Sequence, residues 1–268
     1  MYGILVAFQR FNIRKGIWGS EWIGFENFVT FFNSYYFVRI LGNTFKLSIA
    51  DLVLAWPSSI IFALLLNEVS KSGFKRWVQT FSYLPHFVSM VVICGIIKDF
   101  TNTNGTINDI ISFFGFERQS LLINSKLFIP IYVVSNIWQG MGYGSIIYIA
   151  AISSINPELY ESAIIDGAGR LRQTIHITLP GITPTIITLL ILRIGNILHV
   201  GFEKILLLQN NSNIETSEVI STFVYKKGLV EAVYGYSTAV NLFNSIVCLV
   251  FLFGANMLSR KFSETSLW

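Results

Sequence analysis

The sequence predicts an all-α protein, a polytopic bundle of helices that crosses a membrane. Hydrophobic residues make up 53% of the chain and charged residues only 13%, whereas soluble domains carry about 25% charged residues. The apolar residues gather in runs of about twenty, the length that a helix needs to cross a bilayer. We therefore expect a single transmembrane domain over residues 1–268, with no long basic segment to suggest a nucleic-acid partner.

Five segments are long and apolar enough to be expected as spans. A helix satisfies its own backbone hydrogen bonds inside lipid, so each segment is expected to be helical. The segments are residues 43–66, 78–97, 127–152, 182–200 and 236–258. Cys94 and Cys248 both lie inside them, which favours small buried thiols over a disulfide or a metal pair.

Positive charge in the loops predicts the orientation of the chain, because cytoplasmic loops are richer in lysine and arginine. Successive loops lie on alternate sides of the membrane, and three segments that fall on the same side carry such charges. We expect these segments to be cytoplasmic. The charges are Lys71, Lys75 and Arg76 after the first span, Arg170 and Arg172 before the fourth, and Arg260 and Lys261 near the end. Residues 98–126 and 201–235 are longer and more dilute in positive charge, and are expected outside.

Residues 153–181, between the third and fourth expected spans, predict a two-helix hairpin. Asn156 suits the N-cap, Pro157 the first helical position, and Glu158 the positive end of the helix dipole. With helical periodicity, the first helix has an apolar side and a polar side. The apolar side holds Leu159, Tyr160, Ala163, Ile164 and Gly167, and the polar side holds Glu158, Glu161, Ser162 and Asp166, with Ile165 among them.

A bend and a second helix complete the predicted hairpin. Gly167, Ala168 and Gly169 allow the chain to bend, because glycine reaches backbone conformations that other residues avoid. A second short helix is expected from Arg170 to Pro180, where proline would stop it. The hairpin then presents an apolar side on a loop that no lipid covers, which indicates docking to another protein.

A spaced pattern in this hairpin resembles the EAA loop of ABC importer permeases. Glu161-Ser162-Ala163 is followed by three residues and Gly167, then by nine residues, Ile177, one residue and Leu179-Pro180. Ser162 stands where the pattern has a second alanine. In that family the loop is a cytoplasmic coupling helix that docks in a groove on the ATPase subunit. The resemblance implies ATPase coupling by Glu158, Tyr160, Glu161, Ser162, Ala163, Asp166, Gly167, Ala168, Ile177, Leu179 and Pro180. An ordinary amphipathic hairpin is the alternative.

Further stretches resemble the carbohydrate-uptake permeases, closest to the branch that imports larger oligosaccharides in bacteria. They read GSEWIGFENFVTFF, SYLPHFVSMVV, NIWQGMGYGSIIYIAAISSINPELY and LRIGNILHVGFEKILLL, and the match covers nearly the whole chain. The resemblance implies the type I importer permease fold. Family members have a cytoplasmic N-terminus and another span ahead of the segment that matches Met1-Tyr2-Gly3, so five spans are expected here against the family's six.

The resemblance also implies a function and a set of partners. The chain would be the permease subunit of an ATP-driven, binding-protein-dependent importer that moves oligosaccharides into the cytoplasm by alternating access. It would lie in the bacterial cytoplasmic membrane with a second homologous permease, two ATPase subunits and an extracytoplasmic solute-binding protein. ATP and Mg would belong to the ATPases, with no cofactor on this chain. In agreement, the sequence lacks a phosphate-binding Gly-rich loop followed by Lys and Ser or Thr, and its three scattered histidines argue against a metal site.

Polar side chains inside the expected spans are candidates for a translocation path, because such groups are costly at membrane depth. The candidates are Asn136, Gln139 and Tyr143 in the third span, Arg193 and Asn196 in the fourth, and Asn241 and Asn244 in the last. Arg193 is also expected to form a salt bridge with Glu203 or with another helix. Asp51 and Lys46, five residues apart on the first span, are expected to be a structural pair or a snorkelling end. Interhelical hydrogen bonding is the alternative role for all of them.

Two other functions stay open at this point. An importer of amino acids or phosphate shares the EAA loop, although the sugar-type stretches argue against it. A membrane enzyme or an assembly factor is the alternative from another class. An enzyme would need a cluster of catalytic groups, and the sequence shows no H-E-x-x-H and no G-x-S-x-G.

Overall fold

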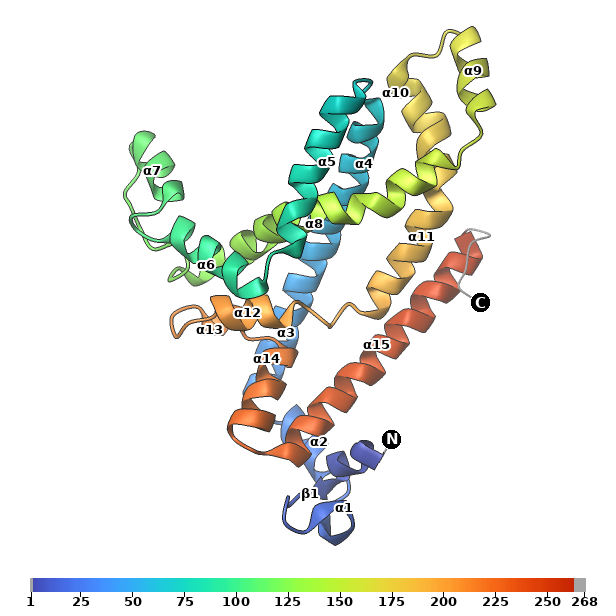
Figure 1. Ribbon diagram of the computed structural model, residues 1–268. Coiled ribbons are helices and arrows are strands. Elements are labelled where there is room, and N and C mark those ends of the chain that lie inside the picture. The colour runs from blue at the N-terminus through green and yellow to red at the C-terminus, as the bar shows by residue number, and fades with distance from the viewer. Residues whose placement is uncertain (1, 263–268) are drawn as a thin grey trace. The chain divides into compact units, whose positions relative to one another are not determined.

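The protein is almost entirely helical in a computed structural model that describes residues 2–262 (Figure 1). Within that range the only strands are β1 (Gln9–Arg10) and β2 (Glu21–Trp22), which pair antiparallel with Gln9 opposite Trp22. The chain divides into two compact units. The first consists of Met1–Ile49, Met90–Tyr132 and Asn196–Phe251, and the second of Ala50–Ser89, Val133–Gly195 and Leu252–Trp268.

The helices of the first unit are mostly short. They are η1 (Tyr2–Phe8), α1 (Gly16–Gly19), α2 (Glu26–Phe32), α3 (Tyr36–Ala50), α6 (Met90–Thr101), α7 (Thr106–Phe113), η3 (Ser125–Leu127), α12 (Phe202–Leu208), α13 (Ile214–Ser217), α14 (Ile220–Tyr225), the π turn η5 (Lys226–Val230) and α15 (Tyr234–Phe262), whose last turns belong to the second unit.

The second unit holds the longer helices and the hairpin. Its elements are the π turn η2 (Asp51–Ala55), α4 (Trp56–Glu68), α5 (Ser72–Phe87), α8 (Phe128–Ser153), α9 (Pro157–Ile165), α10 (Arg170–Gln173), the π turn η4 (Thr174–Thr178) and α11 (Leu179–Gly195). The first five residues of α8 belong to the first unit.

Among the described residues, 2–262, three helical segments are long and apolar enough to cross a membrane. They are Tyr36–Glu68, Arg170–Gly195 and Tyr234–Lys261, and they correspond to the first, fourth and fifth expected spans. A fourth is possible if the pair Ser72–Phe87 and Met90–Phe113 counts as one broken span. The first segment joins α3, η2 and α4 without a break. These positions confirm three of the expected spans.

The prediction of one continuous second span over residues 78–97 is wrong. Two helices, α5 and α6, take its place, and the chain leaves the helix at Val88, which is extended with φ −77° and ψ 139°. Pro85 lies inside the last turn of α5 and donates no backbone hydrogen bond there. A proline weakens a helix, and the β-branched Val88 three residues further on favours an extended backbone, so the span breaks here.

The expected third span forms a 26-residue helix, α8, that is long enough to cross a membrane. It is nevertheless not among the helices that are also apolar enough. Its middle turns carry Asn136, Gln139 and Tyr143 together with three glycines. The helix predicted at this position is therefore confirmed, and the polar residues that lower its mean hydropathy include the candidate path residues themselves.

Pro180 does not stop the second helix of the hairpin, which contradicts the prediction. The helical segment continues from Arg170 to Gly195. A π turn, η4, comes directly before the proline, and the Leu179 N–H donates to the Thr174 carbonyl five residues back. The wider turn relieves the clash between the proline ring and the preceding carbonyl. The π turn η2 comes before Pro57 in the same way.

The fourth span ends earlier than predicted. Helix α11 stops at Gly195, and Asn196 begins a turn in which the His199 N–H donates to the Asn196 carbonyl at 2.9 Å. Asn196, which was expected in the fourth span with Arg193, therefore lies outside the helix. Glycine favours a helix end, and Gly195 is also a close-packing position, because a Cβ there would lie 2.6 Å from Leu252 Cδ1.

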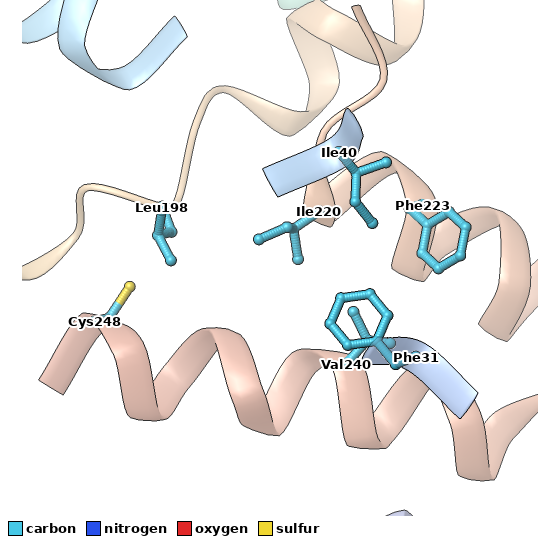
Figure 2. Close-up of a cluster of buried hydrophobic side chains, with 7 residues drawn as sticks. All are labelled: Phe31, Ile40, Leu198, Ile220, Phe223, Val240 and Cys248. Carbon is cyan, nitrogen blue, oxygen red and sulfur yellow. The ribbon is translucent and has the colours of Figure 1, made fainter. Parts of the chain in front are cut away.

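Each unit has its own apolar core. In the first unit, Phe31 and Val240 meet Ile220 and Phe223, while Leu198 and Cys248 point toward each other at one end (Figure 2). In the second unit, the core is formed by Ile60, Ala63, Tyr148, Ile152 and Ile182 of α4, α8 and α11. Cys94 and Cys248 are buried free thiols, which confirms the prediction for both.

Small residues let α8 pack closely in the second unit. A Cβ on Gly144 would lie 2.5 Å from Ser59 Oγ of α4, and a Cβ on Gly142 would overlap the backbone of Ser82 in α5. Neither glycine has room for a side chain. The stretch around Tyr143 is therefore a site of tight helix packing, as small residues between membrane helices usually are.

Candidate functional site

The first helix of the hairpin, α9, begins at a side-chain cap. Asn156 Oδ1 accepts a hydrogen bond from the Glu158 backbone N–H at 3.0 Å, and Asn156 Nδ2 donates to Glu158 Oε2 at 3.1 Å. Pro157 occupies the first helical position, where its missing N–H costs nothing. The predicted start of α9 is confirmed.

The other end of α9 closes with a Schellman motif. Gly167 has φ +73°, a conformation that favours glycine. The Gly167 N–H donates to the Ile164 carbonyl at 3.0 Å, and the Ala168 N–H donates to the Ala163 carbonyl at 2.8 Å. These are the two bonds of the motif. The spacing from Ala163 to Gly167 therefore has a structural cause, because it places the one glycine where the backbone turns.

Side chains fix the two halves of the hairpin to each other. The hydroxyls of Tyr160 and Thr178 are hydrogen-bonded at 2.9 Å, which ties α9 to η4. Gln173 Nε2 donates to the Ala168 carbonyl at 2.7 Å, across the bend. Figure 1 shows the resulting hairpin at one end of α8 and α11. Both hydrogen bonds that hold the bend therefore come from within the hairpin.

The hairpin lies beside the end of α4. Arg170 Nη1 donates to the Glu68 carbonyl at 3.5 Å, and Thr174 Oγ1 donates to Glu68 Oε1 at 3.2 Å. The loop that carries Lys71 follows Glu68 directly. Two of the three positively charged segments are therefore at the same end of the second unit, as the orientation prediction requires.

Large apolar side chains of the hairpin are exposed. Ile165 is 86% exposed and Leu171 is 74% exposed, while Leu159 and Ile164 are also exposed. The predicted apolar side is thus divided: Tyr160 and Ala163 are half-buried against the rest of the hairpin, and the others face outward. The acidic and polar coupling candidates Glu158, Glu161, Ser162 and Asp166 are exposed, as are Leu179 and Pro180, whereas Ala168 and Ile177 are half-buried.

Two of the path candidates, Asn136 and Arg193, both contact Asp51, which was not itself a path candidate. Asp51 lies in the π turn of the first span, with 6% of its side chain exposed. Its Oδ2 forms an ion pair with Arg193 Nη2, and its Oδ1 accepts from Asn136 Nδ2 at 2.8 Å. Three elements, η2, α8 and α11, therefore meet at one carboxylate. We call these three residues the Asp51 cluster.

The predicted pairings of these charges are partly wrong. Arg193 was expected to pair with Glu203 or with another helix, and it pairs with Asp51 of the first span. Asp51 was expected to pair with Lys46, and its partner is Arg193. The sequence signalled Asp51 as an acid inside an apolar run, but it held no sign of which helix would supply the base.

Tyr143 forms a stacked pair that sequence reasoning missed. Its ring lies 3.8 Å from the His86 ring, centroid to centroid, with 3° between the planes. Phe87 meets the Tyr143 ring edge-on at 5.8 Å. His86 lies in the last turn of α5, so the stack joins α5 to α8. Gln139, one turn before Tyr143 on α8, is half-buried.

The remaining path candidates belong to the first unit. Asn196 is exposed in the turn after α11, and Asn241 is exposed on α15. Asn244 is buried, and its Oδ1 has no hydrogen-bond partner among residues 2–262. Of the candidates in the second unit, Asn136 and Arg193 share Asp51 as a contact partner.

Comparison with known proteins gives the family. The model of the binding-protein-dependent transport system inner membrane component family matches residues 55–264. Protein LplB of Bacillus subtilis (strain 168) is 45% identical over 269 residues, which cover 100% of this chain and 85% of LplB. The polygalacturonan/rhamnogalacturonan transport system permease protein YteP of the same organism is 44% identical over 269 residues, covering 100% of this chain and 84% of YteP.

Two solved structures share the fold. A bacterial ABC transporter involved in the import of the acidic polysaccharide alginate matches with a TM-score of 0.90 and 45% identity, over 97% of this chain and 87% of that chain. A bacterial alginate ABC transporter in complex with alginate pentasaccharide-bound periplasmic protein matches with a TM-score of 0.89 and 46% identity, over 91% of this chain and 85% of that chain. The type I importer permease fold is thereby confirmed. The chain belongs to the family of inner membrane components of binding-protein-dependent transport systems.

Proposed function

We propose that this chain is the permease subunit of an ATP-driven importer that moves oligosaccharides into the bacterial cytoplasm by alternating access. The family supplies the membrane component of binding-protein-dependent transport. The names of the relatives support oligosaccharides as the substrate class. YteP is named for polygalacturonan and rhamnogalacturonan transport, and the two matching structures are alginate transporters. A permease named for sn-glycerol-3-phosphate transport is only 28% identical over 77% of this chain, which favours oligosaccharides over small phosphorylated solutes.

The observation that carries the mechanism is the exposed apolar surface of the hairpin. A loop capped at both ends and tied across its bend keeps Ile164, Ile165 and Leu171 in water. Exposed apolar patches on an ordered element are typical of protein interaction sites. We assign this surface to docking on the ATPase, so that closure of two ATPases on ATP pulls the hairpin and switches the spans between outward-open and inward-open states.

The partners of the complex follow from this assignment. A second homologous permease would complete the pathway, two ATPase subunits would bind and hydrolyse ATP with Mg, and an extracytoplasmic solute-binding protein would deliver the sugar. A periplasmic protein accompanies one of the matching alginate transporters, which supports the last of these for this chain. This chain itself would bind no nucleotide.

Co-purification tests the docking assignment. Ile165→Asp places a charge in the centre of the proposed interface and should abolish recovery of the ATPase with the tagged permease, while the permease stays inserted in the membrane. Ile123→Asp is the matched control, because Ile123 is also exposed but lies in the segment expected on the other side of the membrane. Normal ATPase recovery with Ile165→Asp would refute the coupling assignment.

A further inference from the structure

Arg193 presents a half-exposed guanidinium that a buried acid holds in place. Its side chain is 52% exposed, whereas that of Asp51 is 6% exposed. Within residues 2–262 its one ion pair is through Nη2 to Asp51 Oδ2. A guanidinium has five N–H donors, so most of its hydrogen-bonding capacity remains for an acceptor outside this chain.

The acid in the Asp51 cluster is buried and each of its oxygens has a donor within the cluster, whereas the base is half-exposed. Each Asp51 oxygen has one donor, Arg193 Nη2 on Oδ2 and Asn136 Nδ2 on Oδ1. The carboxylate therefore neutralises and orients the guanidinium without being available to a solute. Asp51 also begins the π turn η2, and π turns inside helices often mark functional sites.

An aromatic surface lies on the same helix as Asn136. Tyr143 is seven residues further along α8, which places it on the same face about 10 Å away. One face of its ring stacks on His86, and 43% of the residue is still exposed. The helix that helps to hold Asp51 thus also presents a flat ring, and a ring together with an anchored guanidinium suits a ligand that carries both sugar rings and carboxylates.

We propose that Arg193 binds a carboxylate of an acidic, uronate-containing oligosaccharide during transport, and that Asp51 and Asn136 are the positioning residues that hold it. This inference rests on the proposed function and narrows its substrate class. Arginine matches a carboxylate with two parallel hydrogen bonds, which a lysine ammonium cannot reproduce. A neutral oligosaccharide has no group of this geometry, so Arg193 selects for acidic sugars at the membrane as well as at the binding protein.

The test compares two forms of one substrate in the complete importer. The permease, its partner permease, the ATPases and the binding protein are reconstituted in liposomes, and initial uptake is measured for a uronate oligosaccharide and for its methyl-esterified, neutral form. Each substrate is supplied bound to the binding protein at a saturating concentration, and the uptake rate is divided by the amount of assembled complex. The acid-to-neutral uptake ratio is compared between variants, so the preference of the binding protein cancels.

The variants separate recognition from folding. Removing one partner of a buried ion pair destabilises a protein, whereas removing both charges is often tolerated. The double variant Asp51→Asn with Arg193→Gln should therefore assemble and lower the ratio about tenfold, the effect of losing one charge-assisted contact. Arg260→Gln, which removes an exposed arginine at the end of α15, is the matched control and should leave the ratio unchanged.

An unchanged ratio in the double variant overturns the proposal. If uptake of both substrates falls equally, the ratio is likewise unchanged, and the loss would indicate a structural pair or a contact with lipid phosphate. Should the double variant fail to assemble, Arg193→Lys keeps the charge beside Asp51 and must still lower the ratio several-fold. Uptake of neither substrate by the wild-type importer would refute the proposed function itself, and this inference with it.

Discussion

At the scale of single residues, Gly167 adopts a backbone conformation that other residues avoid. Gly167 turns the backbone after α9 with φ +73°, whereas Gly169, two residues on, has φ −69° and open space around its Cα. Gly167→Ala should destabilise the hairpin by about 1 kcal/mol because alanine resists this conformation. Gly169→Ala should not.

Hydrogen–deuterium exchange over residues 157–168 measures this difference. The expected result is exchange about fivefold faster in Gly167→Ala than in Gly169→Ala, the factor that corresponds to about 1 kcal/mol. Equal exchange in the two variants would show that the Schellman motif does not hold the bend.

A second pair of glycines tests helix packing. A Cβ on Gly142 would overlap the Ser82 backbone, whereas one on Gly140, also in α8, would meet nothing. Gly142→Ala should therefore destabilise the solubilised protein by about 1–3 kcal/mol, the usual cost of overpacking. Gly140→Ala should be neutral or stabilising, since alanine favours a helix. The thermal unfolding midpoint is the measurement, and equal midpoints would contradict the close contact between α8 and α5.

Sequence patterns that act within a few residues predicted the helix cap and the bend correctly. They did not predict which distant residue a charged side chain pairs with. The Asn156 cap and the Gly167 bend follow from rules that act within a few residues, and both are confirmed. The partner of Arg193 lies 142 residues away in the chain. Polarity indicated that Arg193 and Asp51 each needed a partner, but only tertiary packing decides which one.

At the scale of elements, the misplaced helix ends share one cause. Proline was expected to end a helix at Pro180, yet η4 absorbs it, and Pro85 instead weakens a helix that was expected to continue. Whether a proline breaks a helix depends on whether the preceding turn can widen. Tertiary packing determines whether that turn can widen. Packing also accompanies the end of α11, where Gly195 lies close to Leu252. Composition therefore predicted where most helices lie but not where they stop.

The hairpin as an element is predicted to dock and not to support folding. Gly167→Pro, or Glu161→Lys together with Ala163→Asp, should abolish ATPase association while leaving membrane insertion intact. The reason is that these residues contact little outside the hairpin, and Glu161 is exposed. ATPase recovery and membrane yield are measured together. Loss of membrane insertion in step with ATPase recovery would contradict the docking role.

At the scale of the whole molecule, thiol labelling tests the orientation. Ser72 and Asn104 are both exposed, and Ser72 follows the end of α4 that contacts the hairpin. With Cys94 and Cys248 replaced, a cysteine at position 72 should be protected from an impermeant reagent in whole cells, and one at position 104 should react. The reverse pattern would place the hairpin outside the cell and contradict its coupling role.

The central claim is that the hairpin transmits ATP hydrolysis to a pathway for oligosaccharides. ATP-driven uptake of a uronate oligosaccharide into liposomes, measured with the complete complex and loaded binding protein, tests it most directly. We predict uptake that requires ATP and the binding protein and that is lost in Ile165→Asp but kept in Ile123→Asp. Uptake by Ile165→Asp at the wild-type rate, or by the wild-type complex without ATP, would contradict the claim.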